Sequence, residues 1–291
     1  MDGQRLLVIG AGGFLGMHAV RYAEGKFEVA RGERSANGET GTIRVDISDV
    51  ASVDNAFAQV RPNCVLLLAA MSDIDACEAR PEEAFATNAK GAENVAKACA
   101  QTNARLLFTS TAAVFDGRKH GYQEEDDVSP LSVYGKTKVL AENVVRSLLP
   151  ASIILRFGLV LGFARKSGTN AMLDNLLQKW KAGETVNFPT CEMRNPIDAR
   201  SLSTIMIDML CNSELAGIYH VGSADSISRY ELGKRLAARV GVSESLVHPQ
   251  ETPSPGRAPR GEDHFLLTDK IHRDCHIVAA TSDQVIERCF S

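Results

Sequence analysis

Residues 5–16 read Arg-Leu-Leu-Val-Ile-Gly-Ala-Gly-Gly-Phe-Leu-Gly, and this stretch decides the expected fold. An apolar run from Arg5 to Ile9 ends at Gly10, and apolar residues with helical spacing follow from Phe14 to Ala23. Glycines let the backbone turn sharply, and the N–H groups at the start of the helix attract an anion. A strand, a glycine turn and a helix in this order favour a site for the pyrophosphate of a dinucleotide. We expect the cofactor to contact Gly10, Gly13, Phe14, Leu15 and Gly16.

The same alternation continues through the first half of the chain. Further apolar runs lie at 27–30, 42–45, 64–69, 105–109 and 152–156, and helix-like stretches lie at 50–60, 81–102 and 133–148. Strands rich in Val, Ile and Leu that alternate with helices predict a parallel sheet with helices on both faces and right-handed crossovers. The expected fold class is therefore α/β, a doubly wound sheet of the Rossmann type.

After Arg156 the alternation becomes less regular. The sequence predicts a helix at 171–182, a buried strand at 218–221, a helix at 229–239 and a proline-rich segment at 249–259. We expect a dinucleotide-binding domain over residues 1–156, to which a segment near 196–221 returns. Residues 157–291 are then expected to form a smaller substrate-binding domain.

Composition indicates a globular protein that acts on small molecules. The chain has 291 residues, is 44% hydrophobic and carries a net charge of -4 without a long basic run. Neither nucleic acid nor a membrane surface is therefore an expected partner. The first apolar run is too short for a secretory or membrane-spanning segment, and the seven cysteines are scattered like reduced thiols, so the cytoplasm is expected. The only grouping that resembles metal ligands is His272, Cys275 and His276, and because no second group of ligands accompanies it we expect no metal site. The oligomeric state stays open, with a homodimer as one option.

The segment after the second predicted strand bears on the choice between NADP and NAD. It reads Ala-Arg-Gly-Glu-Arg-Ser over residues 30–35. Arginine at this position suits a 2'-phosphate, whereas an acidic side chain suits the ribose hydroxyls of NAD. Arg31, Arg34 and Ser35 thus favour NADP, while Glu33 keeps NAD open.

Two more stretches are expected to meet the cofactor. Asp46 and Ile47 follow the third predicted strand, where they would bracket the adenine, with Asp46 accepting from its amino group. Ala69 and Ala70 end the fourth predicted strand, at the same edge of the sheet.

Tyr134 and Lys138 are the candidate reacting pair. They are four residues apart in the predicted helix at 133–148, so both side chains lie on one face and can point at one carbonyl. Downstream of a dinucleotide turn, this pair is typical of a hydride-transfer enzyme.

With these residues the chain resembles an extended short-chain dehydrogenase/reductase and, within that superfamily, the dTDP-4-dehydrorhamnose reductase family. The likeness spans nearly the whole chain. It is carried by residues 10–16, by 69–78 with Pro81 and Asn88, by 110–117, by Tyr122 through Pro130 to Tyr134 and Lys138, and by 194–198.

The resemblance implies roles for individual residues. Tyr134 would be the general acid that protonates a ketone oxygen, and Lys138 would lower the phenol's pKa and reach the nicotinamide ribose. Thr111 would donate a hydrogen bond to the substrate carbonyl, with Ser110 as the neighbouring alternative. Ser72 resembles a hydroxyl that contacts substrate in the family.

The chain departs from the family at two substrate-side positions. Ala112 and Ala113 stand where relatives have Asp-Tyr. Each lost hydrogen bond to a substrate hydroxyl costs on the order of 1 kcal/mol, so a less polar substrate is one reading. Arg257 and Arg260, in a loop that follows the family pattern only loosely, are expected to clamp a diphosphate.

The expected function is that of an NADP-preferring reductase acting on the 4-keto group of a nucleotide-linked 6-deoxy sugar. One alternative is a nucleotide-sugar epimerase or dehydratase-type relative, which keeps its NAD bound. The other is a regulatory subunit that binds NADP, because the resemblance extends to the beta subunit of methionine adenosyltransferase.

Overall fold

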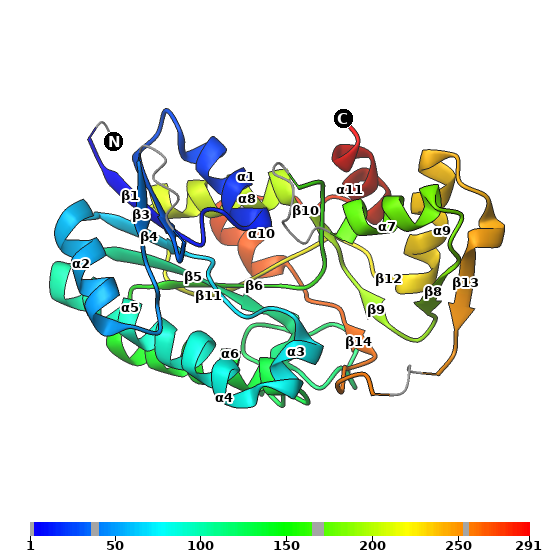
Figure 1. Cartoon of the computed structure of the whole chain (residues 1–291), viewed down its shortest axis with the longest axis horizontal. Coiled ribbons are helices and arrows are strands. Elements are labelled where there is room, and N and C mark those ends of the chain that lie inside the picture. Colours follow the sequence, from blue (N-terminus) through cyan, green and yellow to red (C-terminus); the bar gives the residue numbers. More distant parts are fainter. Residues whose placement is uncertain (1–2, 36–40, 165–171, 253–255) are drawn as a thin grey trace.

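The computed structural model describes residues 3–35, 41–164, 172–252 and 256–291 (Figure 1). Its centre is a seven-stranded sheet in the order β11-β6-β5-β4-β1-β2-β3, and each neighbouring pair of strands is parallel. The strands are β1 (Arg5–Ile9), β2 (Glu28–Glu33), β3 (Thr42–Arg44), β4 (Cys64–Leu67), β5 (Arg105–Thr111), β6 (Ile153–Phe157) and β11 (Gly217–Val221). The predicted doubly wound α/β fold is confirmed.

Helices cover both faces of this sheet (Figure 1). On one face lie α1 (Phe14–Ala23), α8 (Ala199–Cys211) and α10 (Asp269–Cys275), and on the other α2 (Val50–Val60), α5 (Gly91–Thr102) and α6 (Val133–Leu148). Because successive strand residues point to opposite faces, Leu6 and Val8 of β1 enter the first core, while Leu7 and Ile9 enter the second. Both faces are apolar because both are buried.

The predicted continuous helix at 81–102 is wrong in detail. After α3 (Ile74–Ala79) the chain forms α4 (Pro81–Ala84), a π-helical segment η1 (Phe85–Lys90) and then α5. The buried Asn88 lies within this π-helical segment. Its amide exchanges hydrogen bonds of 2.7 and 2.9 Å with the Met71 backbone and donates to Thr137 Oγ1 at 3.0 Å. This side chain therefore ties the segment after β4 to α6.

A separate apolar core holds together the C-terminal region, which lies to the right in Figure 1. Its helices are α7 (Met172–Lys181), α9 (Arg229–Val240) and α11 (Ser282–Cys289), together with the 3-10 turn η3 (Glu244–Leu246). Its short strands are β7 (Val160–Leu161), β8 (Val186–Pro189), β9 (Met193–Arg194), β10 (Ile197–Asp198), β12 (Ile227–Ser228), β13 (Val247–Gln250) and β14 (Asp263–His264). Ala171, the expected first residue of α7, and residues 253–255 of the proline-rich segment lie outside the described residues.

The chain leaves this region for the main sheet twice, first with α8 and β11 and later with α10. Helix α8 packs on α1, and β11 pairs with β6 as the edge strand, with Gly217 opposite Ile153 and Val221 opposite Phe157. Within the described ranges, no helix has both the length and the apolar character needed to cross a membrane.

Candidate active site

The glycine loop, residues 10–16, lies where the strand order reverses. Strand β1 has β2 on one side and β4 on the other, the arrangement that opens a crevice at the carboxyl ends of the strands. Gly10 has a φ of +95°, and a Cβ there would come within 2.7 Å of the Ala69 nitrogen. A Cβ on Gly16 would lie 2.1 Å from the Gly10 oxygen. Both positions therefore require glycine, and Ala69 borders the loop as expected.

The start of α1 fits the pyrophosphate of a dinucleotide. Its N-cap is Gly13, which provides no side-chain cap, and the first turn contains no acidic residue. By contrast, Asp49 caps α2 and Ser132 caps α6 with side-chain oxygens. The positive end of the α1 dipole is thus not compensated by the helix's own side chains, which suits a bound anion.

The residues that bear on the choice between NADP and NAD lie at different distances from the glycine loop. Glu33 ends β2 and reaches over the glycine loop, since a Cβ on Gly12 would be 2.7 Å from Glu33 Oε2. Arg34 and Ser35 follow directly and are exposed. Arg31 lies earlier in β2, and its guanidinium pairs at 3.4 Å with Glu24, beyond the far end of α1, so its contact with a 2'-phosphate stays a prediction.

The residues expected to bracket the adenine, Asp46 and Ile47, have partners within the protein. Asp46 Oδ1 accepts hydrogen bonds from the Ser48 nitrogen at 3.0 Å and hydroxyl at 2.6 Å, and these bonds hold the pKa of Asp46 below its usual value. Ile47 is buried against Gly91 at the start of α5, within the core. The side chain of Ile47 thus packs in the core, and contact of Asp46 and Ile47 with the adenine stays a prediction.

Thr111 and Tyr134 come together where β5 ends and α6 begins. The 3-10 turn η2 (Ala112–Val114) follows Thr111, and a Cβ on Gly135 would lie 2.3 Å from the Ala113 oxygen, so the first turn of α6 packs tightly on η2. Burial raises the pKa of Tyr134 to about 12, and interaction with the Thr111 hydroxyl partly opposes that rise. The phenol is therefore protonated at neutral pH.

Lys138 lies one helical turn further along α6 and is only 2% exposed. Its Nζ is 4.1 Å from the centre of the Phe108 ring. Burial lowers the pKa of Lys138 to about 7, against the opposing charge of Glu142. The expectation that Lys138 lowers the pKa of Tyr134 is not met, because burial dominates both groups and leaves the lysine only partly charged at neutral pH.

Ser110 does not share the position of Thr111. It is buried, and its hydroxyl donates to Glu142, whose carboxylate also accepts bonds of 2.9 and 2.6 Å from Arg156. The alternative of Ser110 as a substrate contact is therefore wrong. Ser72 is exposed beyond β4, two residues before Ile74, which lines the cavity described next.

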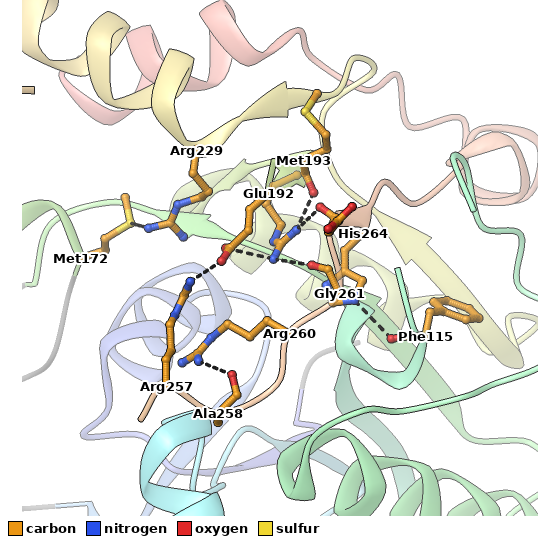
Figure 2. A network of polar contacts seen from close by, with 12 residues as sticks. Phe115, Met172, Glu192, Met193, Arg229, Arg257, Ala258, Arg260, Gly261 and His264 are labelled. Carbon is orange, nitrogen blue, oxygen red and sulfur yellow. Dashed lines mark hydrogen bonds and ion pairs between the residues drawn. The ribbon is translucent and has the colours of Figure 1, made fainter. Parts of the chain in front are cut away.

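A cavity extends from Thr111 into the C-terminal region. Near Thr111 its wall is apolar and includes Ala112, Ala113, Ile74 and Leu131. The opposite part, which we call the arginine cavity, contains one carboxylate and four guanidinium groups: Glu192, Arg194, Arg229, Arg257 and Arg260 (Figure 2). Arg257 and Arg260 were expected here, whereas no role was predicted for Glu192, Arg194 or Arg229.

The arginine cavity has an excess of positive charge. Arg260 donates to both oxygens of Asp75, at 2.9 and 2.7 Å, and Glu192 pairs with Arg194 at 3.1 Å and with Arg257. Four guanidinium charges against the carboxylates of Glu192 and Asp75 leave two in excess. In the part of the chain that the structure describes, no three His, Cys, Asp or Glu side chains are grouped to hold a metal.

Comparison with known proteins places the chain in a family. Residues 4–291 match the family described as the RmlD substrate binding domain. The dTDP-4-dehydrorhamnose reductase of Aggregatibacter actinomycetemcomitans is 29% identical and covers 92% of each chain. The beta subunit of methionine adenosyltransferase 2 from Xenopus laevis is 26% identical and covers 93% of this chain and 82% of its own.

Solved structures agree with this fold. The crystal structure of the dTDP-4-dehydrorhamnose reductase of Bacillus anthracis, in complex with NADP, superposes with a TM-score of 0.89 over 99% of each chain at 24% identity. The chain therefore belongs to the RmlD substrate binding domain family, within the extended short-chain dehydrogenases/reductases, a superfamily of NAD(P)-dependent oxidoreductases.

Proposed function

We propose that the protein is a reductase that transfers a hydride to the 4-keto group of a nucleotide-linked 6-deoxy sugar. The observation that carries this proposal is the cavity, which joins the Thr111 hydroxyl to an excess of two positive charges. The protonated phenol of Tyr134 interacts with that hydroxyl. A diphosphate that links a nucleoside to a sugar carries two negative charges, so its charge matches the arginine cavity.

The residues at the other end suit proton donation to a ketone oxygen. When bound, the reduced nicotinamide supplies the hydride. Tyr134 is protonated at neutral pH, as a general acid must be, and the Thr111 hydroxyl lies beside it to orient the carbonyl. Lys138, on the same helix face, would compensate the phenolate that remains after the proton has left.

The apolar wall supports a deoxygenated sugar. Ala112 and Ala113 offer no side-chain hydrogen bonds, whereas a fully hydroxylated ring would need polar partners in this position. The relative from Aggregatibacter is named for reduction of a 4-keto-6-deoxy sugar, which fits this chemistry.

For the coenzyme we propose NADPH, with NADH as a second donor. Arg34 and Ser35 follow β2 where a 2'-phosphate would lie, and the Bacillus relative was solved with NADP. Glu33, placed over Gly12, opposes a 2'-phosphate and favours the free ribose hydroxyls of NADH.

The test is oxidation of NADPH and NADH, followed by nicotinamide absorbance, with a panel of nucleotide-linked 4-keto-6-deoxy sugars. Tyr134→Phe serves as the matched control, since it removes only the phenolic oxygen. Turnover by the wild type but not by the variant supports the proposal. If the wild type binds the reduced coenzyme yet consumes none with any sugar of the panel, the proposal is wrong.

A second candidate is a non-catalytic subunit that binds NADP. It is favoured by the similarity to the beta subunit of methionine adenosyltransferase 2, which extends over most of both chains. Coenzyme binding without turnover, together with a co-purifying larger partner, would support this candidate over the reductase.

A further inference from the structure

Glu192 is a buried carboxylate inside a cavity that is otherwise cationic (Figure 2). It precedes β9 and is 6% exposed. Burial works to raise the pKa of Glu192, but the bond from Arg257 and the charges of Arg194 and Arg229 outweigh it and hold the pKa below its usual value. The side chain is therefore ionised and occupies space where an anionic ligand would meet the arginines.

The two arginines that bind Glu192 are held differently. Arg194 also donates to the backbone oxygens of Met193, Glu262 and Gly261, at 2.7, 3.0 and 3.1 Å. These bonds fix its guanidinium whether or not Glu192 stays in place. Arg257 has Glu192 as its partner, lies in a loop beyond β13, and is more exposed, at 24% of its side chain. Arg257 is thus the arginine that can change partners.

Among the described residues, no carboxylate forms an ion pair with Arg229. It begins α9 and lines the cavity, and its Nη2 lies 3.6 Å from the Met172 sulfur, a weak acceptor. Its Nε is buried and has no hydrogen-bond partner within the described ranges. An unpaired buried donor is costly, so this group gains most from a ligand that carries charge into the cavity.

We propose that the carboxylate of Glu192 occupies the position that a ligand phosphate takes on binding. A diphosphate then replaces Glu192 as the ion-pair partner of Arg257 and also pairs with Arg229. This inference rests on the proposed function, from which the diphosphate comes. Because the ligand must replace an existing ion pair, Glu192 lowers the affinity of the site.

Calorimetric titration with inorganic pyrophosphate tests this proposal without any turnover. Glu192→Gln releases Arg257 and should tighten pyrophosphate binding roughly tenfold. Arg229→Gln should weaken it by about tenfold or more. Glu287→Gln is the matched control, because it removes an equally charged carboxylate that is exposed and paired with Arg239 on the outer surface, and it should leave binding unchanged.

Two results overturn the inference. One is a folded Glu192→Gln protein that binds pyrophosphate no more tightly than the wild type. The other is an Arg229→Gln protein that binds pyrophosphate as tightly as the wild type. If Glu192→Gln does not fold, the Arg229→Gln measurement alone tests the inference. The two hypotheses can fail separately. If Glu192→Gln binds pyrophosphate more tightly but the wild type turns over no sugar of the panel, only the reductase function is refuted. If the wild type turns over a sugar but Glu192→Gln gains no pyrophosphate affinity, only the role of Glu192 is refuted.

Discussion

We expect Lys138 to make protein stability and turnover depend on pH in opposite directions. In the folded chain its pKa is lowered to about 7, first by burial, with Glu142 opposing. In the unfolded chain a lysine titrates near ~10.4. Between these values the unfolded chain holds a proton that the folded chain has released, so the free energy of unfolding rises with pH.

The magnitude can be worked out as the difference between the wild type and Lys138→Met, in which the contributions of the other titrating groups cancel. Buried histidines such as His220, whose pKa is lowered to about 3, change stability below about pH 6.5, where unfolded histidine titrates. Buried thiols such as Cys99, whose pKa is raised, act above about pH 8.5 and with the opposite sign. From about pH 7 to 8.5, the Lys138 proton should contribute roughly 1.5–2 kcal/mol.

Urea unfolding of the wild type and of Lys138→Met across this window measures the effect. The wild type should gain roughly 1.5–2 kcal/mol relative to the variant, which has no proton to release. Wild-type turnover should fall over the same window, because the ammonium that compensates the phenolate is lost. A difference in unfolding free energy that stays constant within about 0.5 kcal/mol from pH 7 to 8.5 would refute the reasoning.

Three more substitutions test separate parts of the site. Tyr134→Phe should lower kcat by about 100-fold or more while coenzyme affinity stays near that of the wild type, and wild-type turnover would exclude Tyr134 as the proton donor. Glu33→Gln should raise the ratio of kcat/KM for NADPH over NADH roughly tenfold by removing a charge near the 2'-phosphate, so an unchanged ratio would place Glu33 outside coenzyme selection. Arg156→Met leaves the buried Glu142 without its bidentate partner and should lower the free energy of unfolding by about 3–5 kcal/mol. Replacing both residues by apolar ones should cost less, and equal costs in urea unfolding would contradict the importance of the pairing.

The sequence predicts those features of the site that depend on local order along the chain. The alternation of strands and helices predicts the doubly wound sheet, and the glycine spacing predicts a tight loop that Gly10 and Gly16 bear out. The spacing of four residues between Tyr134 and Lys138 places both on one face of α6, as the helix in the structure requires.

The sequence does not predict which face of a strand points toward the cavity, or which distant segments meet there. Ser110 and Thr111 are neighbours in β5, and strand geometry sends their side chains to opposite faces, but the sequence does not say which face meets the cavity. Arg229 and Glu192 come from segments far apart in sequence and meet only through the packing of the C-terminal strands, in which β12 pairs with β9. No local spacing could have connected them.

The late return of β11 to the sheet has a consequence for synthesis on the ribosome. Until residue 211 has emerged, the sheet face that α8 covers stays open to solvent, and until residue 221 has emerged, the outer edge of β6 has no partner. An unpaired strand beside an uncovered apolar face is the usual starting point for aggregation of a nascent chain. The glycine loop and the Tyr134 helix are thus made early, but the sheet that supports them is completed only after most of the chain has been translated, which makes early chaperone contact advantageous for this fold.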